Sequence, residues 1–392
     1  MSSNLKGTRV VLVRHGQSTY NALGLYQGKC DRPLLTETGY KDARLTGEFL
    51  KKLKFDAIYS SSLQRSQATA KEILKTISPQ TNPNTINFTY QLRETDLPDW
   101  EGLAFQYVRE NFSQDYHHWK QRPHEFCMQS GETNSIYPAL DLYQRVREFW
   151  QEILPRHQGK TLLIVAHGGT NRALISTALG IAPNRYHCIQ QSNCGISVLH
   201  FPDGSLESGS LEAMNLTNHV GECLPKLQES GSGLRLLLLP LEVTQTQQLA
   251  LLLQETNIDF SIIEDNFNSQ AIAKKILQDH PETVQLKFLS QDFPENWQQG
   301  INARNTASTF ITGLVVGNLN IIKRLVGNAL GINVDFQQSL QLTPGTITSI
   351  HYPGNKHYPV LQVMNLSGLA TNSILDLESI KSKDFIPVQT PT

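Results

Sequence analysis

The sequence predicts an α/β fold, a three-layer α/β/α arrangement in which helices cover both faces of a mostly parallel sheet. Val10–Val13 is an aliphatic run without polar interruption, which is typical of a parallel strand buried on both faces. Thr161–Val165 repeats this pattern. Between the two runs, short strand-like segments alternate with amphipathic helical ones, as expected of a wound sheet.

The remaining elements follow from local signals. Thr36 is the expected N-cap of a helix whose apolar face consists of Tyr40, Ala43, Gly47 and Leu50. A second helix is expected to start near Leu63, with Arg65 in its first turn. Further strands are predicted at Phe55–Tyr59, Phe88–Leu92 and Ile196–Phe201, the last of them at an edge, and a helix is predicted at Asn171–Leu179.

Both buried runs end in a histidine followed by glycine. Arg14-His15-Gly16 follows the first run, and Ala166 precedes His167-Gly168-Gly169 after the second. One histidine after a strand is usually structural, but two such ends are hard to explain that way. Parallel strands bring their carboxyl ends to one edge of the sheet, so these histidines can converge there with Arg14 and Arg65.

Composition excludes several classes of protein. The 34 Lys and Arg residues nearly balance the 35 Asp and Glu residues, which speaks against a nucleic-acid surface or a polybasic membrane contact. Met1–Lys6 is polar with no apolar segment behind it, and no apolar run approaches the roughly 18–20 residues of a membrane span. The five cysteines form no C-x-x-C pair, so a reduced, cytoplasmic protein without a metal site is expected.

Three separated motifs resemble the histidine phosphatase superfamily, the phosphoglycerate mutase-like clan. They are R-H-G-Q-S-T-Y-N at 14–21, S-S-L-Q-R-S at 61–66 and A-H-G-G at 166–169, within a similarity that spans about residues 8–220. The resemblance implies that His15 attacks phosphorus and becomes a phosphohistidine, which water hydrolyses. Arg14, Arg65 and His167 would stabilise the charged phosphoryl oxygens, so no metal or cofactor is needed.

The resemblance also places a general acid at Glu94, in L-R-E-T-D-L-P-D-W-E-G. Asp96, Asp99 and Glu101 compete for this role within the same stretch, where they otherwise read as a polar loop. Asn21, Gln27, Gly28 and Gly168 resemble phosphate-contacting positions of the family, and an ordinary polar turn is the alternative for the loop that holds the first three.

The segment Ala104–Thr133 is aromatic and polar, and in this family such an insertion covers the pocket. Its basic residues either grip a second anionic group of the substrate or form a solvated helix face: His117, His118, Lys120, Arg122 and His124, with Trp119 among them. A basic lid suits a small acidic metabolite such as phosphoserine or a sugar-acid phosphate like 2-carboxyarabinitol 1-phosphate. A phosphoglycerate mutase and a non-catalytic phosphometabolite sensor are the alternative functions.

After a linker-like stretch at Gln228–Gly233, the chain repeats its own pattern. Arg235–Thr244 matches Arg9–Ser18, Ser269–Leu277 matches Ser66–Leu74, and Val315–Ile332 matches Ile164–Ile181. The alignment replaces Arg14, His15, Arg65 and His167 by Pro240, Leu241, Asn268 and Asn318.

The expected organisation is therefore a catalytic domain (1–225), a linker (226–232), a degenerate repeat (233–370) and a polar tail (371–392). This arrangement is similar to that of 2-carboxyarabinitol 1-phosphate phosphatase-like proteins. The repeat is expected to serve as a lid, an allosteric binding module or the surface of a homodimer.

Overall fold

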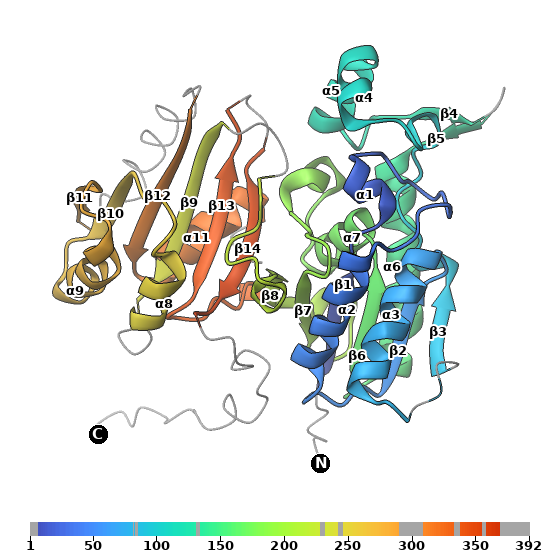
Figure 1. Cartoon of the computed structure of the whole chain (residues 1–392), viewed down its shortest axis with the longest axis horizontal. Helices are drawn as coiled ribbons and strands as arrows, with labels where there is room; N and C mark the ends of the chain where they lie inside the picture. The colour runs from blue at the N-terminus through green and yellow to red at the C-terminus, as the bar shows by residue number, and fades with distance from the viewer. Residues whose placement is uncertain are drawn as a thin grey trace, which may run out of the picture.

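One sheet of twelve strands runs through the described residues of the computed structural model, in the order β11-β10-β12-β9-β13-β14-β8-β7-β1-β6-β2-β3 (Figure 1). The structure describes residues 7–80, 82, 85–130, 134–227, 232–241, 246–289, 309–332, 338–354 and 358–368. Of the predicted linker, only residues 226, 227 and 232 are described, and Met1–Lys6 and the predicted tail at 371–392 lie outside the described residues.

The N-terminal half supplies six of these strands. They are β1 (Thr8–Arg14), β2 (Ala57–Ser61), β3 (Ile86–Thr89), β6 (Thr161–Ala166), β7 (Ile196–Phe201) and β8 (Ser210–Leu216). Its helices are α1 (Thr19–Leu23), α2 (Glu37–Leu50), α3 (Gln64–Ile77), α4 (Phe105–Asn111), α5 (Ser113–Gln121), α6 (Pro138–Arg156) and α7 (Gly168–Ala178). The first four strands are parallel to one another, β7 runs antiparallel to both of its neighbours, β1 and β8, and β4 (Met128–Ser130) pairs separately with β5 (Asn134–Ile136).

The C-terminal half supplies the other six strands. They are β9 (Gly233–Pro240), β10 (Phe260–Glu264), β11 (Val284–Phe288), β12 (Phe310–Gly317), β13 (Ile347–Tyr352) and β14 (Val360–Leu366). Its described helices of eight residues or more are α8 (Thr246–Leu253), α9 (Phe267–Ile276) and α11 (Leu319–Leu330). Counted outward from the centre, β14-β13-β9-β12-β10-β11 has the same order and relative strand directions as β8-β7-β1-β6-β2-β3.

Alternate side chains of β1 pack into two different core layers, because successive residues of a strand point to opposite faces. Val10 and Leu12 belong to the layer that contains Trp150 of α6, while Val11 and Val13 belong to the layer that contains Ile73 of α3. Both faces of the sheet are therefore covered, and the prediction of a mostly parallel, doubly buried sheet is confirmed.

Helix α2 begins where its N-cap was predicted, since Thr36 Oγ1 accepts the Gly39 N–H at 3.1 Å. Helix α3 begins directly after Leu63, also as predicted. The strand predicted at Phe88–Leu92 begins two residues earlier, at Ile86, and ends at Thr89, where a 3-10 turn capped by the Thr89 side chain replaces its predicted second part.

Two further predictions need correction. Ile196–Phe201 is a strand but neither the last nor an edge, since β8 follows and pairs with it. The helix predicted at Asn171–Leu179 begins earlier, at Gly168, with His167 as its N-cap residue. Two glycines after the histidine make the first turn look like a loop in the sequence.

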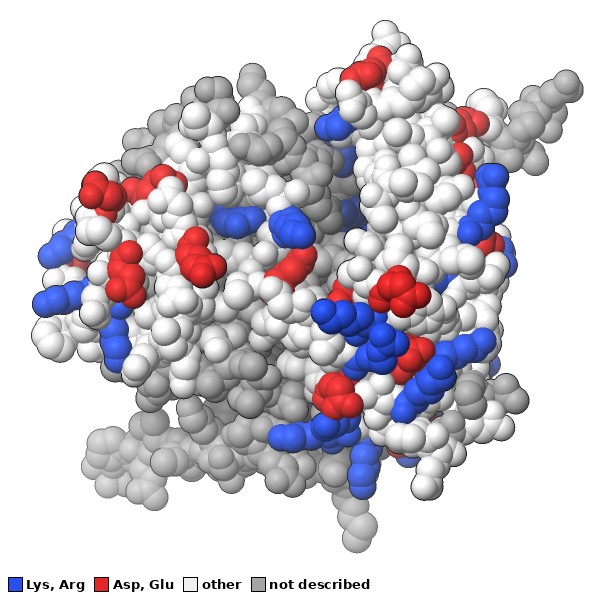
Figure 2. Space-filling view, viewed as in Figure 1, with Lys and Arg blue, Asp and Glu red and all other residues white. Residues whose placement is uncertain are grey.

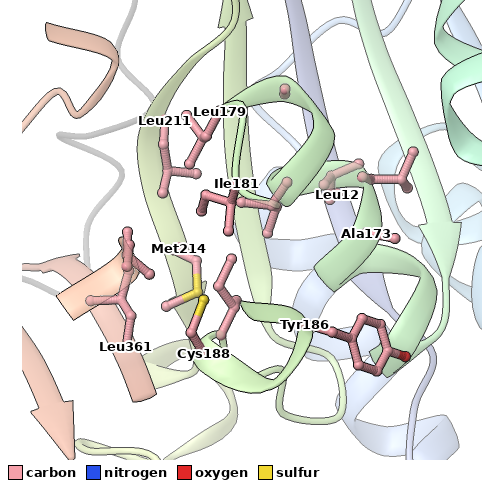
Figure 3. Packing of buried hydrophobic residues seen from close by; sticks show 14 of the residues in the cluster. Leu12, Ala173, Leu179, Ile181, Tyr186, Cys188, Leu211, Met214 and Leu361 are labelled. Atoms are coloured by element: carbon pink, nitrogen blue, oxygen red, sulfur yellow. The ribbon is translucent and has the colours of Figure 1, made fainter. Parts of the chain in front are cut away.

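Strands β8 and β14 join the two halves. They pair antiparallel at Met214 and Met364, and Met214 lies beside Cys188 and Leu361 in the packed cluster of Figure 3. We call this contact, together with the segments that flank it, the seam. Because its apolar side chains come from both halves, one core layer continues across it.

In the described part of the chain, no helix has the length and apolar character needed to cross a membrane. On the face shown in Figure 2, basic and acidic side chains are interspersed.

Candidate active site

The two histidines of the sequence motifs lie side by side at the carboxyl edge of the sheet. His15 directly follows β1 and His167 directly follows β6, and these strands are neighbours in parallel register. The His15 N–H donates to Ala166 O at 2.9 Å, and the two ring centroids are 5.1 Å apart. The convergence predicted from parallel strands is therefore found for this pair.

The side chain of His15 is oriented by its own backbone neighbour. Its Nδ1 lies 2.8 Å from Gly16 O, and because a carbonyl can only accept, Nδ1 carries the hydrogen. The Nε2 atom then holds the lone pair whenever the ring is neutral. Burial, followed by the cations Arg65 and Arg14, holds the pKa of His15 well below its ordinary value. In the neutral ring that the lowered pKa favours, the Nε2 lone pair is therefore free to act as a base or a nucleophile.

Two arginines enter the site from different elements. Arg65, in the first turn of α3, donates from Nη1 to Cys30 O (2.8 Å) and from Nη2 to Gly28 O (3.0 Å). Arg14, at the end of β1, donates from Nη1 to Gln191 O at 2.6 Å. Burial lowers the pKa of each guanidinium to about 10, so both remain cationic at neutral pH.

His167 is held through its Nε2 atom, whereas His15 is held through its Nδ1 atom. Its Nε2 lies 2.7 Å from Ser61 Oγ and 3.3 Å from Ser66 Oγ. Burial, followed by Arg65, His15 and Arg14, holds its pKa well below the ordinary value. Its Nδ1 is buried, and within the described residues no partner accepts from it or donates to it.

Glu94 lies at the N-terminus of α7, the helix that starts one residue after His167. Its Oε1 accepts the N–H groups of Thr95 (2.8 Å) and Thr170 (3.0 Å), and its Oε2 accepts that of Gly169 (3.0 Å). Backbone N–H groups at a helix start have no partner within the helix, so these hydrogen bonds fix the position of the Glu94 side chain.

The three competing carboxylates have other surroundings. Asp96 forms an ion pair with Lys29 at 2.7 Å. Glu101 accepts the Cys30 N–H at 2.9 Å and so supports the loop that Arg65 holds, while Asp99 is exposed. Among these four, Glu94 alone is bonded to the first turn of α7 in the described structure.

Asn21 lies in the short helix α1 and not in the expected loop, while Gln27 and Gly28 lie in the loop that follows this helix. Ser18 Oγ donates to Gln27 Oε1 at 2.8 Å, and Gly28 has a φ of 50° and offers its carbonyl to Arg65. Gly168 lies against Arg14, since a Cβ built there would be 3.4 Å from the Arg14 Nε. Gly28 and Gly168 therefore border the guanidinium groups, whereas the side chains of Asn21 and Gln27 form hydrogen bonds with Ser18 and Asn193.

Sequence reasoning missed two residues of the segment before β7. Gln191 supplies the carbonyl that accepts from Arg14, and Asn193 Nδ2 donates to His15 O (2.9 Å) and to Asn21 Oδ1 (3.1 Å). A polar run, Q-Q-S-N, before an apolar strand was the one signal available. This run does not indicate that its hydrogen-bond partners are Arg14, His15 and Asn21, more than 170 residues earlier in the chain.

The expected lid, α4 and α5 with the β4–β5 hairpin, extends beyond the end of the sheet that carries α1 (Figure 1). Its candidate binding residues contact neighbours in the lid: His117 Nδ1 donates to Ser113 O, Arg122 pairs with Glu125 at 3.2 Å, and Lys120 Nζ lies 5.7 Å from the centre of the Tyr116 ring. Trp119 is buried against Phe126, so it belongs to the core of the lid.

Residues 10–215 match the family described as "Histidine phosphatase superfamily (branch 1)". The chain is 37% identical over 212 residues to a probable 2-carboxy-D-arabinitol-1-phosphatase of Arabidopsis thaliana, which covers 53% of this chain and 42% of the plant protein. This chain therefore matches less than half of that relative's length.

Two bacterial relatives are covered almost entirely. Phosphoserine phosphatase 1 of Hydrogenobacter thermophilus is 31% identical over 214 residues, covering 55% of this chain and 95% of that protein. A 2,3-bisphosphoglycerate-dependent phosphoglycerate mutase of Brucella anthropi is 34% identical over 195 residues, covering 49% of this chain and 90% of that protein. All of these similarities are to proteins named as phosphatases or mutases.

Proposed function

The chain belongs to the histidine phosphatase superfamily, and we propose that its N-terminal half is a metal-independent phosphomonoester phosphatase that acts through a phosphohistidine on His15. One observation carries the proposal. Arg14 Nε, Arg65 Nε and His167 Nδ1 are buried nitrogens that have no hydrogen-bond partner in the described part of the chain. Unsatisfied buried donors are costly, and an anionic phosphoryl group beside His15 would supply their acceptors.

In the first half-reaction, His15 Nε2 attacks phosphorus and the bond from phosphorus to the ester oxygen breaks. Arg14 and Arg65 stabilise the charge on the equatorial oxygens. The departing alkoxide takes a proton from Glu94, which acts as general acid. The products are the free alcohol and a phosphohistidine.

In the second half-reaction, a water molecule attacks the phosphohistidine. The Glu94 carboxylate accepts the proton of that water, and the bond between phosphorus and Nε2 breaks. Inorganic phosphate leaves and His15 returns to its neutral form. Its strongly lowered pKa favours this form, so the cycle can restart without deprotonation of the ring.

The proposed substrate is a small acidic metabolite, such as phosphoserine or a sugar-acid phosphate like 2-carboxyarabinitol 1-phosphate. The names of the plant relative and of the Hydrogenobacter relative support this class. The basic lid residues His117, Lys120 and Arg122 are proposed to attract the second anionic group.

A phosphoglycerate mutase is the second candidate, favoured by the 34% identity to the Brucella protein. It would use the same phosphohistidine but return the phosphoryl group to a substrate hydroxyl instead of water. The two functions differ in whether inorganic phosphate is released.

The C-terminal half (233–370) is proposed to be a degenerate copy of the N-terminal domain (1–225), joined to it by residues 226–232. The repeated strand order supports this, as does the register in which Pro240 pairs with Gly317 where Arg14 pairs with Ala166. Leu241 and Asn318 follow these strand ends, at the places of His15 and His167. Without these groups the copy has no means of phosphoryl transfer.

Phosphate release from a panel of phosphoesters in the presence of EDTA tests the proposal. The panel contains phosphoserine, 3-phosphoglycerate, 2-carboxyarabinitol 1-phosphate and fructose 2,6-bisphosphate. Release from one member despite the chelator is the expected result. Interconversion of 2- and 3-phosphoglycerate without release would establish the mutase. No turnover together with retained phosphate binding would indicate a sensing protein.

A further inference from the structure

We propose that the C-terminal half positions the catalytic residues Arg14 and His15 through the hydrogen bond that Gln362 of β14 donates to Gln190, in the segment Ile189–Cys194. This inference rests on the proposed function, because it assumes that Arg14 and His15 perform the chemistry. It assigns to the non-catalytic half a role in the site of the other half.

The seam is built reciprocally, with each half giving the other the same contacts. Asn215 Nδ2 donates to Gln362 O at 2.7 Å, and Asn365 Nδ2 donates to Glu212 O at 2.6 Å. Both asparagines are fully buried and have positive φ angles, 54° and 62°. Asn tolerates a positive φ better than most residues do. The two asparagines are therefore equivalent in both backbone conformation and side-chain hydrogen bonds.

The segments that flank the seam follow the same reciprocity. Ile189 bridges to Leu361 and Leu340 bridges to Leu211, both in parallel. The following residues then donate, Gln190 N to Leu361 O and Gln341 N to Leu211 O, each at 2.9 Å. The C-terminal half thus occupies the position that a second copy of the N-terminal half would take in a two-fold dimer.

The catalytic site depends on one of these two segments. Gln190 contacts β14, and the next residues contact the reacting groups: Gln191 O accepts from Arg14 Nη1 at 2.6 Å and Asn193 Nδ2 donates to His15 O at 2.9 Å. Cys194 N–H donates to Arg14 O at 3.1 Å. The path from β14 to the nucleophile is therefore a few consecutive residues long.

Gln362 fixes the near end of this segment. Its Nε2 donates to Gln190 Oε1 at 3.1 Å, and its own Oε1 accepts from Arg235 Nε (3.0 Å) and Ser349 Oγ (3.2 Å). Gln362 is 1% exposed and Gln190 is 3% exposed. A buried amide with all these partners has one favourable orientation. The C-terminal half therefore fixes the position of Gln190, the residue of the segment that Gln362 contacts.

Asn215 provides a second connection. Its Oδ1 accepts the Ser192 N–H at 2.7 Å while its Nδ2 donates to Gln362 O. Its counterpart Asn365 makes the equivalent bond, since its Oδ1 accepts the Thr343 N–H at 2.9 Å. The segment with Thr343 belongs to the C-terminal half, where Pro240 and Leu241 stand in place of Arg14 and His15. The seam therefore offers a matched pair in which one member is connected to the catalytic residues.

The test compares three full-length variants: Gln362→Met, which keeps the volume but removes the donor to Gln190, Asn215→Gly, and the control Asn365→Gly. Binding of orthophosphate is measured by calorimetry, alongside KM, kcat and Tm. We expect Gln362→Met and Asn215→Gly to raise KM and the phosphate Kd on the order of tenfold, because Arg14 is displaced. Asn365→Gly is expected to lower Tm as Asn215→Gly does, with unchanged KM and Kd.

Partial unfolding alone lowers the apparent kcat without moving KM or the phosphate Kd, so these constants separate positioning from loss of folded protein. Wild-type KM and Kd values for Gln362→Met would overturn the inference. If Gln362→Met does not fold, Gln190→Met, which removes the acceptor of the same hydrogen bond, decides the question in its place. A wild-type chain that binds phosphate but releases none from any ester would instead contradict the proposed function, while the comparison of Kd values would still stand.

Discussion

Glu94 and Gly169 are in direct contact: Glu94 Oε2 accepts the Gly169 N–H at 3.0 Å, and a Cβ at Gly169 would lie 2.5 Å from Glu94 Oε1. The same Cβ would meet Thr95 Oγ1 at 2.2 Å and the Tyr186 hydroxyl at 2.3 Å. The site therefore requires glycine here so that the carboxylate can reach the first turn of α7.

Replacing Gly169 by alanine is expected to displace Glu94 and lower kcat on the order of a hundredfold, since a general acid contributes about that much or more. Gly180→Ala is the matched control: its Cβ meets nothing within 4 Å, but its φ of +67° strains an alanine. The control should lose about 1–2 kcal/mol of stability and keep its kcat. Unchanged turnover in Gly169→Ala would remove Glu94 from the mechanism.

His15→Ala is expected to abolish measurable turnover, a loss of at least about a thousandfold, because no nucleophile remains to accept the phosphoryl group. Quenching in alkaline detergent during turnover with a ³²P-labelled ester should trap labelled wild-type protein but unlabelled variant, because a phosphohistidine is stable to base. His157 is a suitable control, since its carbonyl accepts from Thr8 Oγ1 at the opposite end of β1. His157→Ala should keep both turnover and labelling, and a labelled His15→Ala protein would refute the nucleophile.

Arg65→Lys tests whether geometry matters in addition to charge. A lysine keeps the positive charge but cannot donate simultaneously to Cys30 O and Gly28 O from a planar fork. We expect KM for the phosphoester to rise and kcat to fall, each about tenfold. Arg44, whose ion pair with Glu72 at 3.6 Å lies at the surface, provides the control Arg44→Lys, which should match the wild type. Identical kinetics for both variants would mean that charge alone suffices.

His219 is expected to make stability depend on pH. Burial lowers its pKa from 6.5 to about 4, and its Nε2 lies 3.1 Å from Thr46 Oγ1. Between pH 4 and 6.5 the unfolded chain binds a proton that the folded chain excludes, so the free energy of unfolding falls as the pH is lowered through this window. His219 therefore makes the free energy of unfolding about 3 kcal/mol lower near pH 4 than above pH 6.5, where both states leave this histidine neutral.

Urea unfolding of wild type and His219→Gln between pH 4.5 and 6.5 measures this contribution. Glutamine can still bond to Thr46 but does not titrate, so the variant should show a shallower dependence of unfolding free energy on pH. Equal slopes would show that His219 is accessible to protons in the folded state.

Much of the fold was predictable because its signals are local. The aliphatic run Val10–Val13, the N-cap Thr36 and the helix start after Leu63 each depend on a few adjacent residues. The predictions were wrong where the position of an element depends on a neighbouring element of the fold. Ile196–Phe201 looked like an edge strand because β8, which covers it, carries a weaker pattern after a Gly- and Ser-rich turn.

The candidate site shows the same division. Its histidines and arginines could be placed from strand ends and the family resemblance. Gln191 and Asn193 could not, because they act through a main-chain carbonyl and a side-chain amide, which leave no distinctive residue pattern. Trp119 was expected in a substrate-facing lid and is instead core, since exposure on a short amphipathic helix depends on what packs above it.

The sequence alone determined the buried parallel strands, the two histidines at their ends and the repetition of the pattern in the second half. These follow from periodicity and residue type, which act over a few positions along the chain. Tertiary structure decided which carboxylate reaches α7, and it joined β8 to β14 so that Gln362 contacts Gln190. Such hydrogen bonds link residues 75 to 172 positions apart, and only the folded backbone brings their partners within reach.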